Sequence, residues 1–437
     1  MKSLFVEMVN RAEYGTKKNS DNNEHGAWRP REFSDFDDGG AFPEIDVVQF
    51  PNRIGWNEDE NDCIASTEYN FAKLTLMHAE QQLKVVGVEK TSARTSAYAS
   101  FVDFMRAFNE QEVCTNISKF GSLRSAKDVQ IVDDALIDSV EFEKEFVTSF
   151  DGIGLPCVVK NVCCDDFDID LLSMYGDEEI TINDLAPARR TDVEENKQKT
   201  LITTAKRYAQ YLHEYENSNK QQSPYYNNGW RIFSKYPDLK HSFFEMQPRF
   251  LKDIDQTEII LRQTFEILSK SLPRNALSNN IEEMTASVNQ SLNKAFIGPV
   301  GCVTRLHHDA SDAHGFLAQT KGKKLFVLFH PRSDVDATNC CCSSSSSNDD
   351  DNNKSEKNQS LIDPLTFVPV KARENMYSVV VEPGEAIFIP RGWWHYAVSL
   401  ETSQTVMRNW FHATTNAKGL VEMMLKSVNK TVSKNTK

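Results

Sequence analysis

The feature that most constrains this chain is a histidine and an aspartate two residues apart, with a second histidine far downstream: His307, Asp309 and His395. Residues 302–306 are apolar and β-branched, which is typical of a strand. Because side chains of a strand repeat with period 2, we expect His307 and Asp309 to point to one side and His308 to the other. Two histidines and one carboxylate form the facial set that binds non-haem Fe(II) and leaves coordination positions open. The sequence therefore predicts a metal site built by a strand and a distant segment.

The distal histidine lies among short predicted strands separated by turns. Residues 382–385 read Glu-Pro-Gly-Glu, a turn signal, and residues 386–390 form a short apolar strand. An Arg-Gly pair at 391–392 turns the chain again before the aromatic stretch 393–398, which contains His395. We expect a histidine in this setting to face a closed, mostly apolar cavity. Such a cavity would keep stray water away from a reactive metal centre.

Four motifs stand in the order found in one protein family. They are Thr-Arg-Leu-His-His-Asp at 304–309, Gln-Thr-Lys-Gly-Lys-Lys at 319–324, the run from Pro-Gly-Glu to Trp-Trp-His at 383–395, and Asn-Trp-Phe at 409–411. In these motifs the chain resembles JmjC domains, and among them the small cupin-like hydroxylases that include the asparaginyl hydroxylase acting on hypoxia-inducible factor. The resemblance covers about residues 130–415. It implies a mostly β fold with helical additions, whose core is a double-stranded β-helix (the jelly-roll or cupin fold) preceded by a helical N-terminal region.

The resemblance also implies an activity and its cofactors. Members of this family are dioxygenases that use Fe(II) and take 2-oxoglutarate and O₂ as co-substrates. By resemblance, His307, Asp309 and His395 would hold the iron, and no further catalytic residue is implied beyond these ligands. 2-Oxoglutarate would be decarboxylated to succinate while a substrate C–H bond is hydroxylated.

Three further positions match residues near the co-substrate in that family, and we expect a fourth residue to reach the same site. Lys324 matches the lysine that pairs with the distal carboxylate of 2-oxoglutarate, and Thr304 matches a hydroxyl that hydrogen-bonds the same carboxylate. Asn409 matches a polar residue near the co-substrate, and Tyr226 is an aromatic that we expect to reach the site. A buried dianion needs such a cation and such donors, because its desolvation is otherwise not offset.

One interval departs from the family pattern. The family places an asparagine four residues after the aspartate, and this chain has a longer interval between Asp309 and Gln319. Residues 313–315, Ala-His-Gly, stand where the asparagine is expected. The departure leaves the local loop and any amide contact there open, and it does not involve the predicted ligands.

Several functions remain compatible with these residues. The preferred one is hydroxylation of a protein side chain, because the chain resembles the short hydroxylase branch. An N-methyl lysine or arginine demethylase would use the same chemistry on a methyl carbon. A non-catalytic cupin-fold binding protein is a third reading, which the intact ligand set disfavours. A zinc hydrolase could use the same three ligands, but it has no use for a lysine and a threonine that clamp a carboxylate.

The net charge and the composition of the chain limit the kinds of partner that it can bind. The chain of 437 residues has a net charge of −14, which disfavours direct nucleic-acid binding because such binding needs many phosphate contacts. A protein or basic peptide substrate suits this charge, although an acidic surface is also the common state of intracellular proteins. The nine cysteines form no C-x-x-C pair, and no apolar run is long enough to cross a bilayer. We therefore expect a reduced cytoplasmic or nuclear location and no membrane partner.

The chain divides into four predicted regions. Residues 1–60 are expected to be poorly ordered, and residues 61–128 form a helical N-terminal region. The JmjC or cupin-like domain spans 129–415, with a disordered low-complexity insert at about 334–360 that is rich in Cys, Ser, Asp and Asn. Residues 416–437 form a C-terminal helix and tail. In relatives such a helix can support a homodimer, which this sequence does not establish.

Overall fold

The computed structural model describes most of the chain from residue 97 onward. The predicted poorly ordered segment 1–60, the first part of the helical region up to residue 96, nearly all of the predicted insert 334–360 and the tail after residue 424 lie outside the described residues. The described residues are 97–111, 114–133, 137–162, 170–184, 200–217, 224–236, 239, 248, 250–271, 288, 292–333, 335, 360, 362–366, 368–422 and 424.

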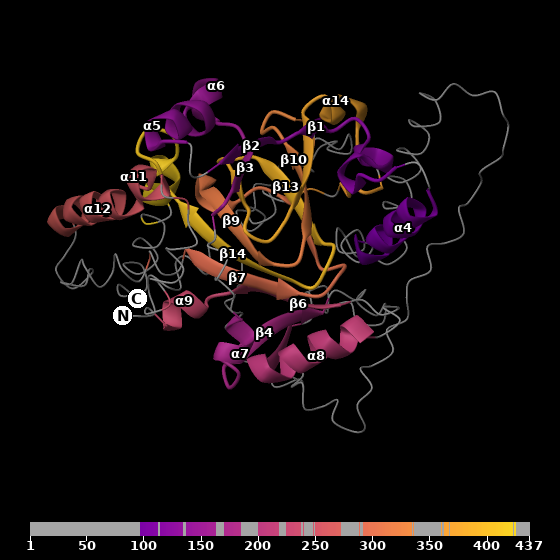
Figure 1. The fold of residues 1–437 in the computed structure, drawn as a ribbon. Helices are drawn as coiled ribbons and strands as arrows, with labels where there is room; N and C mark the ends of the chain where they lie inside the picture. The colour runs from indigo at the N-terminus through magenta and orange to yellow at the C-terminus, as the bar shows by residue number, and fades with distance from the viewer. Residues whose placement is uncertain are drawn as a thin grey trace, which may run out of the picture.

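Strands dominate the described chain and form two sheets that pack face to face (Figure 1). This arrangement, together with helices that cover the outside, is the predicted jelly-roll core with helical additions. The strands are β1 Lys127–Asp128, β2 Gln130–Asp133, β3 Cys157–Lys160, β4 Glu179–Asp184, β5 Thr200–Thr204, β6 Tyr225–Trp230, β7 Asn293–Gly298, β8 Val303–His307, β9 His314–Lys321, β10 Lys324–Phe329, β11 Met376–Val381, β12 Ala386–Ile389, β13 Trp394–Ser399 and β14 Ser403–Trp410.

The smaller sheet has the strand order β1-β11-β10-β13-β8, and the larger sheet has the order β2-β3-β12-β9-β14-β7-β6-β4-β5. In the smaller sheet the neighbours β11, β10, β13 and β8 are antiparallel, whereas β1 joins β11 in parallel. Segments far apart in sequence thus become neighbours: β13 lies between β10 and β8. This topology places the two predicted histidine-bearing strands side by side.

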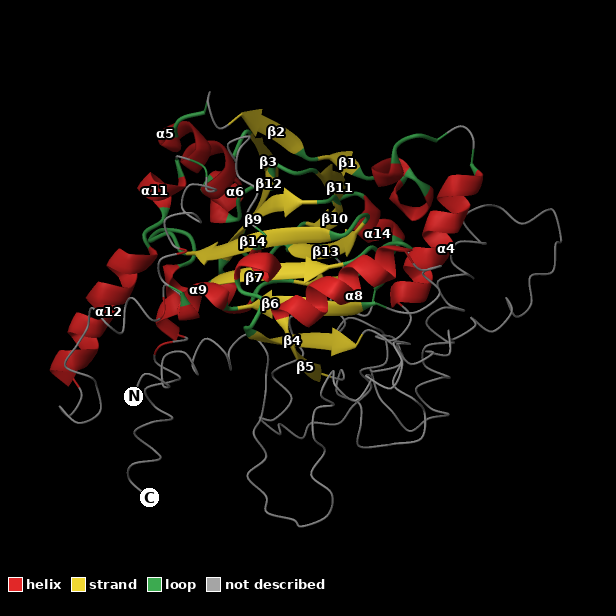
Figure 2. Ribbon diagram, turned by 60° about the horizontal axis from the view of Figure 1, so that its bottom comes forward, coloured by secondary structure: helices red, strands yellow, loops and turns green. Residues whose placement is uncertain are grey.

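Helices cover the outer faces of the two sheets (Figure 2). In Figure 1, α8 lies beneath the β4–β6 end of the larger sheet and α4 lies beside the smaller sheet. The longer helices are α4 Ala97–Glu110, α8 Ala205–Asn217 and α12 Thr257–Ser271. The short ones are α5 Ser139–Phe142, α6 Ser149–Gly152, α7 Leu171–Met174, α9 Ile232–Lys235, α11 Leu251–Ile254 and α14 Val370–Arg373, with 3₁₀ turns η2 Ile117–Lys119, η3 Gly121–Leu123 and η5 Ala310–Asp312.

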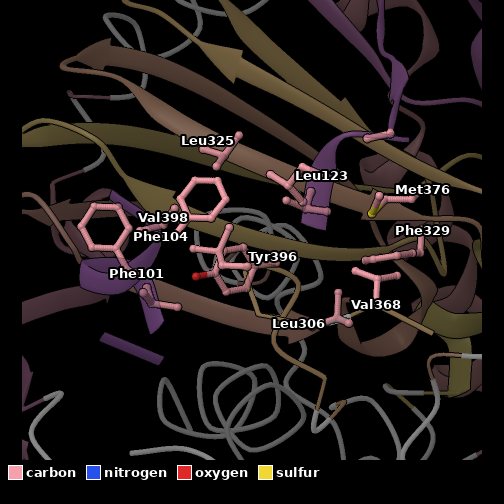
Figure 3. Close-up of a cluster of buried hydrophobic side chains, with 14 of the residues drawn as sticks. Phe101, Phe104, Leu123, Leu306, Leu325, Phe329, Val368, Met376, Tyr396 and Val398 are labelled. Carbon is pink, nitrogen blue, oxygen red and sulfur yellow. The ribbon is translucent and has the colours of Figure 1, made fainter. Parts of the chain in front are cut away.

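The amphipathic pattern predicted in the N-terminal helical region appears in α4. Its residues Tyr98 and Phe101 are buried, and they pack on the outer face of the smaller sheet in one cluster with residues of β8, β10 and β13. Figure 3 shows Phe101 and Phe104 of α4 in this cluster. Burial of such aromatic side chains stabilises the fold by roughly 1.5–3 kcal/mol each. The helix therefore packs against the back of the sheet that carries the histidines.

A second apolar cluster fills the space between the two sheets. Phe326 and Leu328 of β10 meet Ile387 and Ile389 of β12, and all four are almost fully buried. The alternation of these residues along each strand follows from the strand period of 2. The space between the two sheets is therefore apolar around these four residues.

The helical segment after β2 is irregular. It consists of α5 followed by a π-helix, η4 Glu143–Val147. Asp138 caps α5 by accepting the N–H of Glu141 at 2.8 Å. The wider π turn still buries Phe142 and Phe146 together. Among the described helices, none is both long and apolar enough to cross a membrane.

Candidate metal centre

The pairing of two strands brings the predicted histidines together. In the antiparallel pair β8–β13, His307 lies directly opposite His395, and their ring centroids are 4.2 Å apart. The Nε2 atoms of the two rings lie 3.7 and 3.9 Å from the same oxygen, Oδ1 of Asp309. Within the described chain, these three residues are the group of ligand-type side chains close enough to hold one metal ion.

The aspartate reaches this point by a route that the sequence reasoning did not foresee. We expected Asp309 to continue the strand of His307, whereas β8 ends at His307. Asp309 has extended backbone angles outside the ladder and precedes a 3₁₀ turn in which Ser311 has a φ of 61°. His308 faces away as predicted, with its ring packed edge-on against Trp394 at 4.8 Å. The expected geometry holds, but a loop rather than a strand provides it.

Backbone hydrogen bonds fix the orientation of both rings. Nδ1 of His307 donates to the carbonyl of Arg305 at 2.7 Å, and Nδ1 of His395 donates to the carbonyl of Trp393 at 3.1 Å. Because neutral imidazole has one N–H, this assignment leaves the lone pair on Nε2, which faces Asp309. Both rings therefore present an acceptor nitrogen to the same point.

The two rings are also held neutral. Burial lowers the pKa of His307 to about 4, with a further contribution from His395. Burial likewise lowers the pKa of His395 to about 4. Metal ligation requires deprotonated imidazole. The site is therefore in the ligating protonation state throughout the neutral range.

A bulge in the β8–β13 pair explains the spacing of Thr304 and His307. The register passes from His395 opposite His307 to Ala397 opposite Thr304, so that two residues of β8 face the single residue Tyr396. An extra residue reverses the alternation of the strand. Thr304 and His307 thus point to the same side although they are three positions apart, which regular strand periodicity would forbid.

The predicted co-substrate residues gather deeper in the barrel. Lys324 is 3% exposed, and its Nζ donates to the hydroxyl of Tyr226 at 3.5 Å. The Tyr226 hydroxyl lies 3.4 Å from Oγ1 of Thr304. Burial lowers the pKa of Lys324 to about 7. Lys324, Thr304 and Tyr226 therefore form one group of hydrogen-bonding side chains inside the barrel.

Asn409 lies beside the metal site rather than with that group. It faces Gly315 across the β14–β9 pair. A Cβ on Gly315 would lie 3.2 Å from Oδ2 of Asp309 and 3.9 Å from Oδ1 of Asn409. Gly315 belongs to the segment 313–315 that departs from the family pattern. Because it has no Cβ, the carboxylate of Asp309 and the side-chain amide of Asn409 border the space where a Cβ would lie.

Two other buried histidines form a separate group, for which sequence reasoning had no role. Nδ1 of His314 accepts the N–H of Arg391 at 3.1 Å, and Nε2 donates to Thr415 at 2.9 Å. His412 contacts Thr414 through Nδ1 at 3.0 Å and Glu143 through Nε2 at 3.3 Å. Both nitrogens of each ring are engaged. No local sequence signal marks these roles, because every side-chain partner comes from another segment or a tight turn.

Comparisons with known proteins agree with the fold. A family model described as a cupin-like domain matches residues 141–417. Lysine-specific demethylase JMJ30 of Arabidopsis thaliana is 38% identical over 129 residues, 28% of this chain and 26% of that protein. Jumonji C domain-containing protein 5 of Drosophila melanogaster is 31% identical over 117 residues, 27% of each chain.

A third relative is the 2-oxoglutarate and iron-dependent oxygenase JMJD4 of Mus musculus, 24% identical over 115 residues, 26% of this chain and 25% of that protein. The chain thus spans about a quarter of the length of the curated relatives that it matches. The family model covers more than half of the chain, so the chain belongs to the cupin-like domain family. The predicted fold class is confirmed.

Proposed function

We propose that this cupin-like protein is a dioxygenase dependent on Fe(II) and 2-oxoglutarate, and that it hydroxylates a side chain of a protein substrate. The observation that carries the proposal is the pairing of two sites in one barrel. Near the end of β8, His307, Asp309 and His395 converge within 4.8 Å of one another. Further along the same interior, the buried ammonium of Lys324 stands among hydroxyl donors.

The donor set fits iron. Two neutral imidazoles and one carboxylate occupy one side of the site, which is the facial arrangement of non-haem Fe(II) oxygenases and leaves positions for other ligands. Carbonyl acceptors at Arg305 and Trp393 hold the imidazole rings in the ligating tautomer. When bound, Fe(II) with 2-oxoglutarate and O₂ supplies the oxidising chemistry, with succinate and CO₂ as products.

Lys324 explains why the co-substrate would be a dicarboxylate. Its strand position faces Ser399, whereas Leu328 on the same strand faces His395. Four residues of strand separate these points, about 13 Å along the backbone, and the lysine side chain covers part of that distance. A ligand between them needs an anionic group at each end. Lys324 binds one carboxylate, and Thr304 and Tyr226 donate hydrogen bonds to it.

The apolar interior gives the barrel its second role. Phe326, Leu328 and Ala397 lie in the cluster between the sheets. Such walls exclude water from the reacting centre, which strengthens the ionic contacts of Lys324 and limits side reactions. The chain's own contribution is therefore to bind, orient and exclude water, while the metal supplies the reactivity.

A demethylase is the second candidate, and the likeness to JMJ30, named a lysine-specific demethylase, favours it. The two functions share the hydroxylation step, because a hydroxylated N-methyl carbon is subsequently lost as formaldehyde. A hydroxylase and a demethylase of this kind therefore differ only in the substrate carbon that is oxidised. We place hydroxylation of a protein side chain first on the resemblance to the short hydroxylase branch, and the net charge of −14 suits a basic substrate segment.

The test is succinate formation by the full chain. Anaerobically purified protein is loaded with Fe(II) or Zn(II) and supplied with 2-oxoglutarate, O₂ and a peptide library rich in lysine and arginine, with and without N-methyl groups. We expect succinate with Fe(II) only, and products that gain one oxygen atom. Formaldehyde from methylated peptides alone would establish the demethylase instead. Turnover with Zn(II), or no iron binding at all, would refute both.

A further inference from the structure

A buried polar group lies behind the metal centre, on the outer face of the smaller sheet. Arg305, Asp363 and Tyr396 line a small cavity there, with room for about one water molecule. Arg305 stands two residues before His307, and Tyr396 follows His395 directly. Each of the two histidine-bearing strands therefore contributes one member, and the third comes from a different segment.

The bulge places these strand residues. Arg305 and Leu306 of β8 face Tyr396 of β13 at the point where the register shifts. Leu306 and Tyr396 are fully buried in the cluster beneath α4, as Figure 3 shows. An irregular pair of this kind has fewer ladder hydrogen bonds than a regular one, so contacts outside the ladder must hold its shape.

The segment that carries Asp363 is tied to the back of this bulge. The N–H of Ser360 donates to the carbonyl of Leu306 at 2.9 Å. Ser122 donates to the carbonyl of Pro364 at 2.6 Å. The segment thus bridges β8 and the 3₁₀ turn η3, and it delivers one carboxylate to the cavity.

The carboxylate of Asp363 is engaged on one side and faces the cavity on the other. Its Oδ1 accepts the N–H of Leu365 at 3.1 Å, and the hydroxyl of Ser100 on α4 also donates to the carboxylate. Burial raises the pKa of Asp363, and the positive charge of Arg305 opposes that rise. Within the described residues, Oδ2 of Asp363 and the hydroxyl of Tyr396 are buried without a hydrogen-bond partner.

Arg305 connects this group to the metal site. Its side chain lines the cavity with Asp363, and its backbone carbonyl accepts the ring Nδ1–H of His307 at 2.7 Å. A shift of the Arg305 backbone would therefore turn the His307 ring. Loss of a partner that orients a metal ligand typically lowers the metal affinity by roughly 10- to 100-fold.

We propose that Asp363 is a positioning residue: through Arg305 it holds the bulge between the two histidine-bearing strands and so sets the spacing of His307 and His395. This inference rests on the proposed metal site. It assigns a functional role to residues 360 and 362–366, which come from outside the strands of the barrel.

The experiment measures Co(II) binding to the metal-free full chain, by titration and by the visible absorption of the bound ion. We expect wild type to bind one Co(II). For Asp363→Asn we expect an affinity lower by on the order of tenfold and altered visible bands. Arg305→Met should lower the Co(II) affinity to a similar extent, whereas Arg305→Lys should retain most of the wild-type affinity. The double variant Asp363→Asn, Arg305→Met should bind Co(II) no more weakly than the weaker of the two single variants.

The matched control is Asp255→Asn. Asp255 forms a buried ion pair with Arg408 of the larger sheet. Asp255→Asn therefore leaves the buried charge of Arg408 unpaired and destabilises the fold, but it does not alter the bulge. We expect Co(II) affinity within about twofold of wild type. Equal losses in Asp255→Asn and Asp363→Asn, or folded Asp363→Asn and Arg305→Met with wild-type binding, would overturn the positioning role. If Asp363→Asn does not fold, the two Arg305 variants decide alone. Absence of Co(II) binding in wild type would instead refute the metal site itself.

Discussion

Among the described residues, His307 and His395 form one pair of histidines and His314 and His412 form another, and the contrast between the pairs separates the proposed metal ligands from structural histidines. His307 and His395 each use Nδ1 on a backbone carbonyl and turn Nε2 toward one carboxylate oxygen. His314 and His412 each engage both ring nitrogens with protein partners. The first pair keeps one lone pair available on each ring, and the second pair does not.

Burial does not distinguish His395 from the structural pair, and a lowered pKa does not distinguish it from His314. His395 is 5% exposed, and His314 and His412 are 0% and 2% exposed. Burial lowers the pKa of His314 well below its ordinary value, as it does for His395. The number of ring nitrogens that remain available for a ligand is therefore the better criterion. A metal ion that binds a ring nitrogen already engaged in a hydrogen bond must first break that bond, which costs free energy.

The largest expected effect is the loss of iron binding when a proposed ligand histidine is removed and a structural histidine is kept. His395→Ala removes one of three metal ligands, so we expect Fe(II) binding and succinate formation to be lost. His412→Ala removes a structural ring instead, and we expect it to lower the free energy of unfolding by roughly 1–3 kcal/mol while the iron content of the folded protein stays that of wild type. Metal analysis and chemical denaturation of both variants measure the two quantities.

The reverse pattern would contradict the criterion. If His412→Ala emptied the site while its fold persisted, or if His395→Ala kept a full complement of iron, then ring hydrogen bonding would not identify the ligands. His314→Gln is a second structural variant for this comparison, since the amide can keep one donor and one acceptor. Its iron content should also equal that of wild type.

A smaller effect concerns the buried lysine of the proposed co-substrate site. Lys324→Met should weaken 2-oxoglutarate binding by roughly 10- to 100-fold, the value of one charge-assisted hydrogen bond. Lys323→Met is the matched control, because Lys323 is exposed and pairs with Glu382 at 2.8 Å. Calorimetric titration of both variants, loaded with the same metal, provides the comparison. Equal affinities would refute the role of Lys324.

The same lysine predicts a pH dependence. Its pKa is about 7 because burial disfavours the ammonium, and a bound dianion favours the ammonium and raises that pKa. Binding above about pH 7 therefore takes up a proton, so the affinity is highest below pH 7 and declines by up to about tenfold per unit above it. Calorimetric titration of 2-oxoglutarate at about pH 8 in buffers of different ionisation enthalpy measures the number of protons taken up on binding. If no proton is taken up, Lys324 is not neutral in the free protein at that pH.

The sequence was most informative where local pattern determines structure. The predicted strand 386–390 matches β12 to within one residue. Tyr226 could be suggested only by resemblance, and its contacts with Lys324 and Thr304 depend on the placement of β6. The fold class followed from motif order, because these motifs mark successive strands of one barrel.

Sequence reasoning failed where cross-strand geometry decides. No local signal shows that β8 ends at His307 or that a bulge reverses its alternation, since both depend on how β13 pairs with it. For the same reason Asp363 attracted no attention: its partners Arg305 and Ser100 are distant in sequence. Residues that act through another strand therefore become visible only once the register is known.

The smallest expected effect tests the boundary between the two histidine pairs. His314 and Gly315 are consecutive on β9, so the side chain of His314 and a Cβ added at Gly315 point to opposite faces of the sheet. His314 joins the structural group, and the face of Gly315 borders Asp309. A Cβ in Gly315→Ala would lie 3.2 Å from Oδ2 of Asp309, which forces the carboxylate to move by a few tenths of an ångström.

Such a displacement touches one ligand and none of the His314 contacts. We therefore expect Gly315→Ala to lower Fe(II) affinity by on the order of tenfold or less, with almost no change in the free energy of unfolding. Gly176→Ala is the control, because the nearest atom to its Cβ is Cβ of Lys206 at 3.4 Å, an ordinary contact far from the site in the fold. Metal titration and denaturation of both variants separate the two faces of β9. A loss of stability in Gly315→Ala without a loss of affinity would mean that the two faces are mechanically coupled, and that the ligand group is not independent of the structural one.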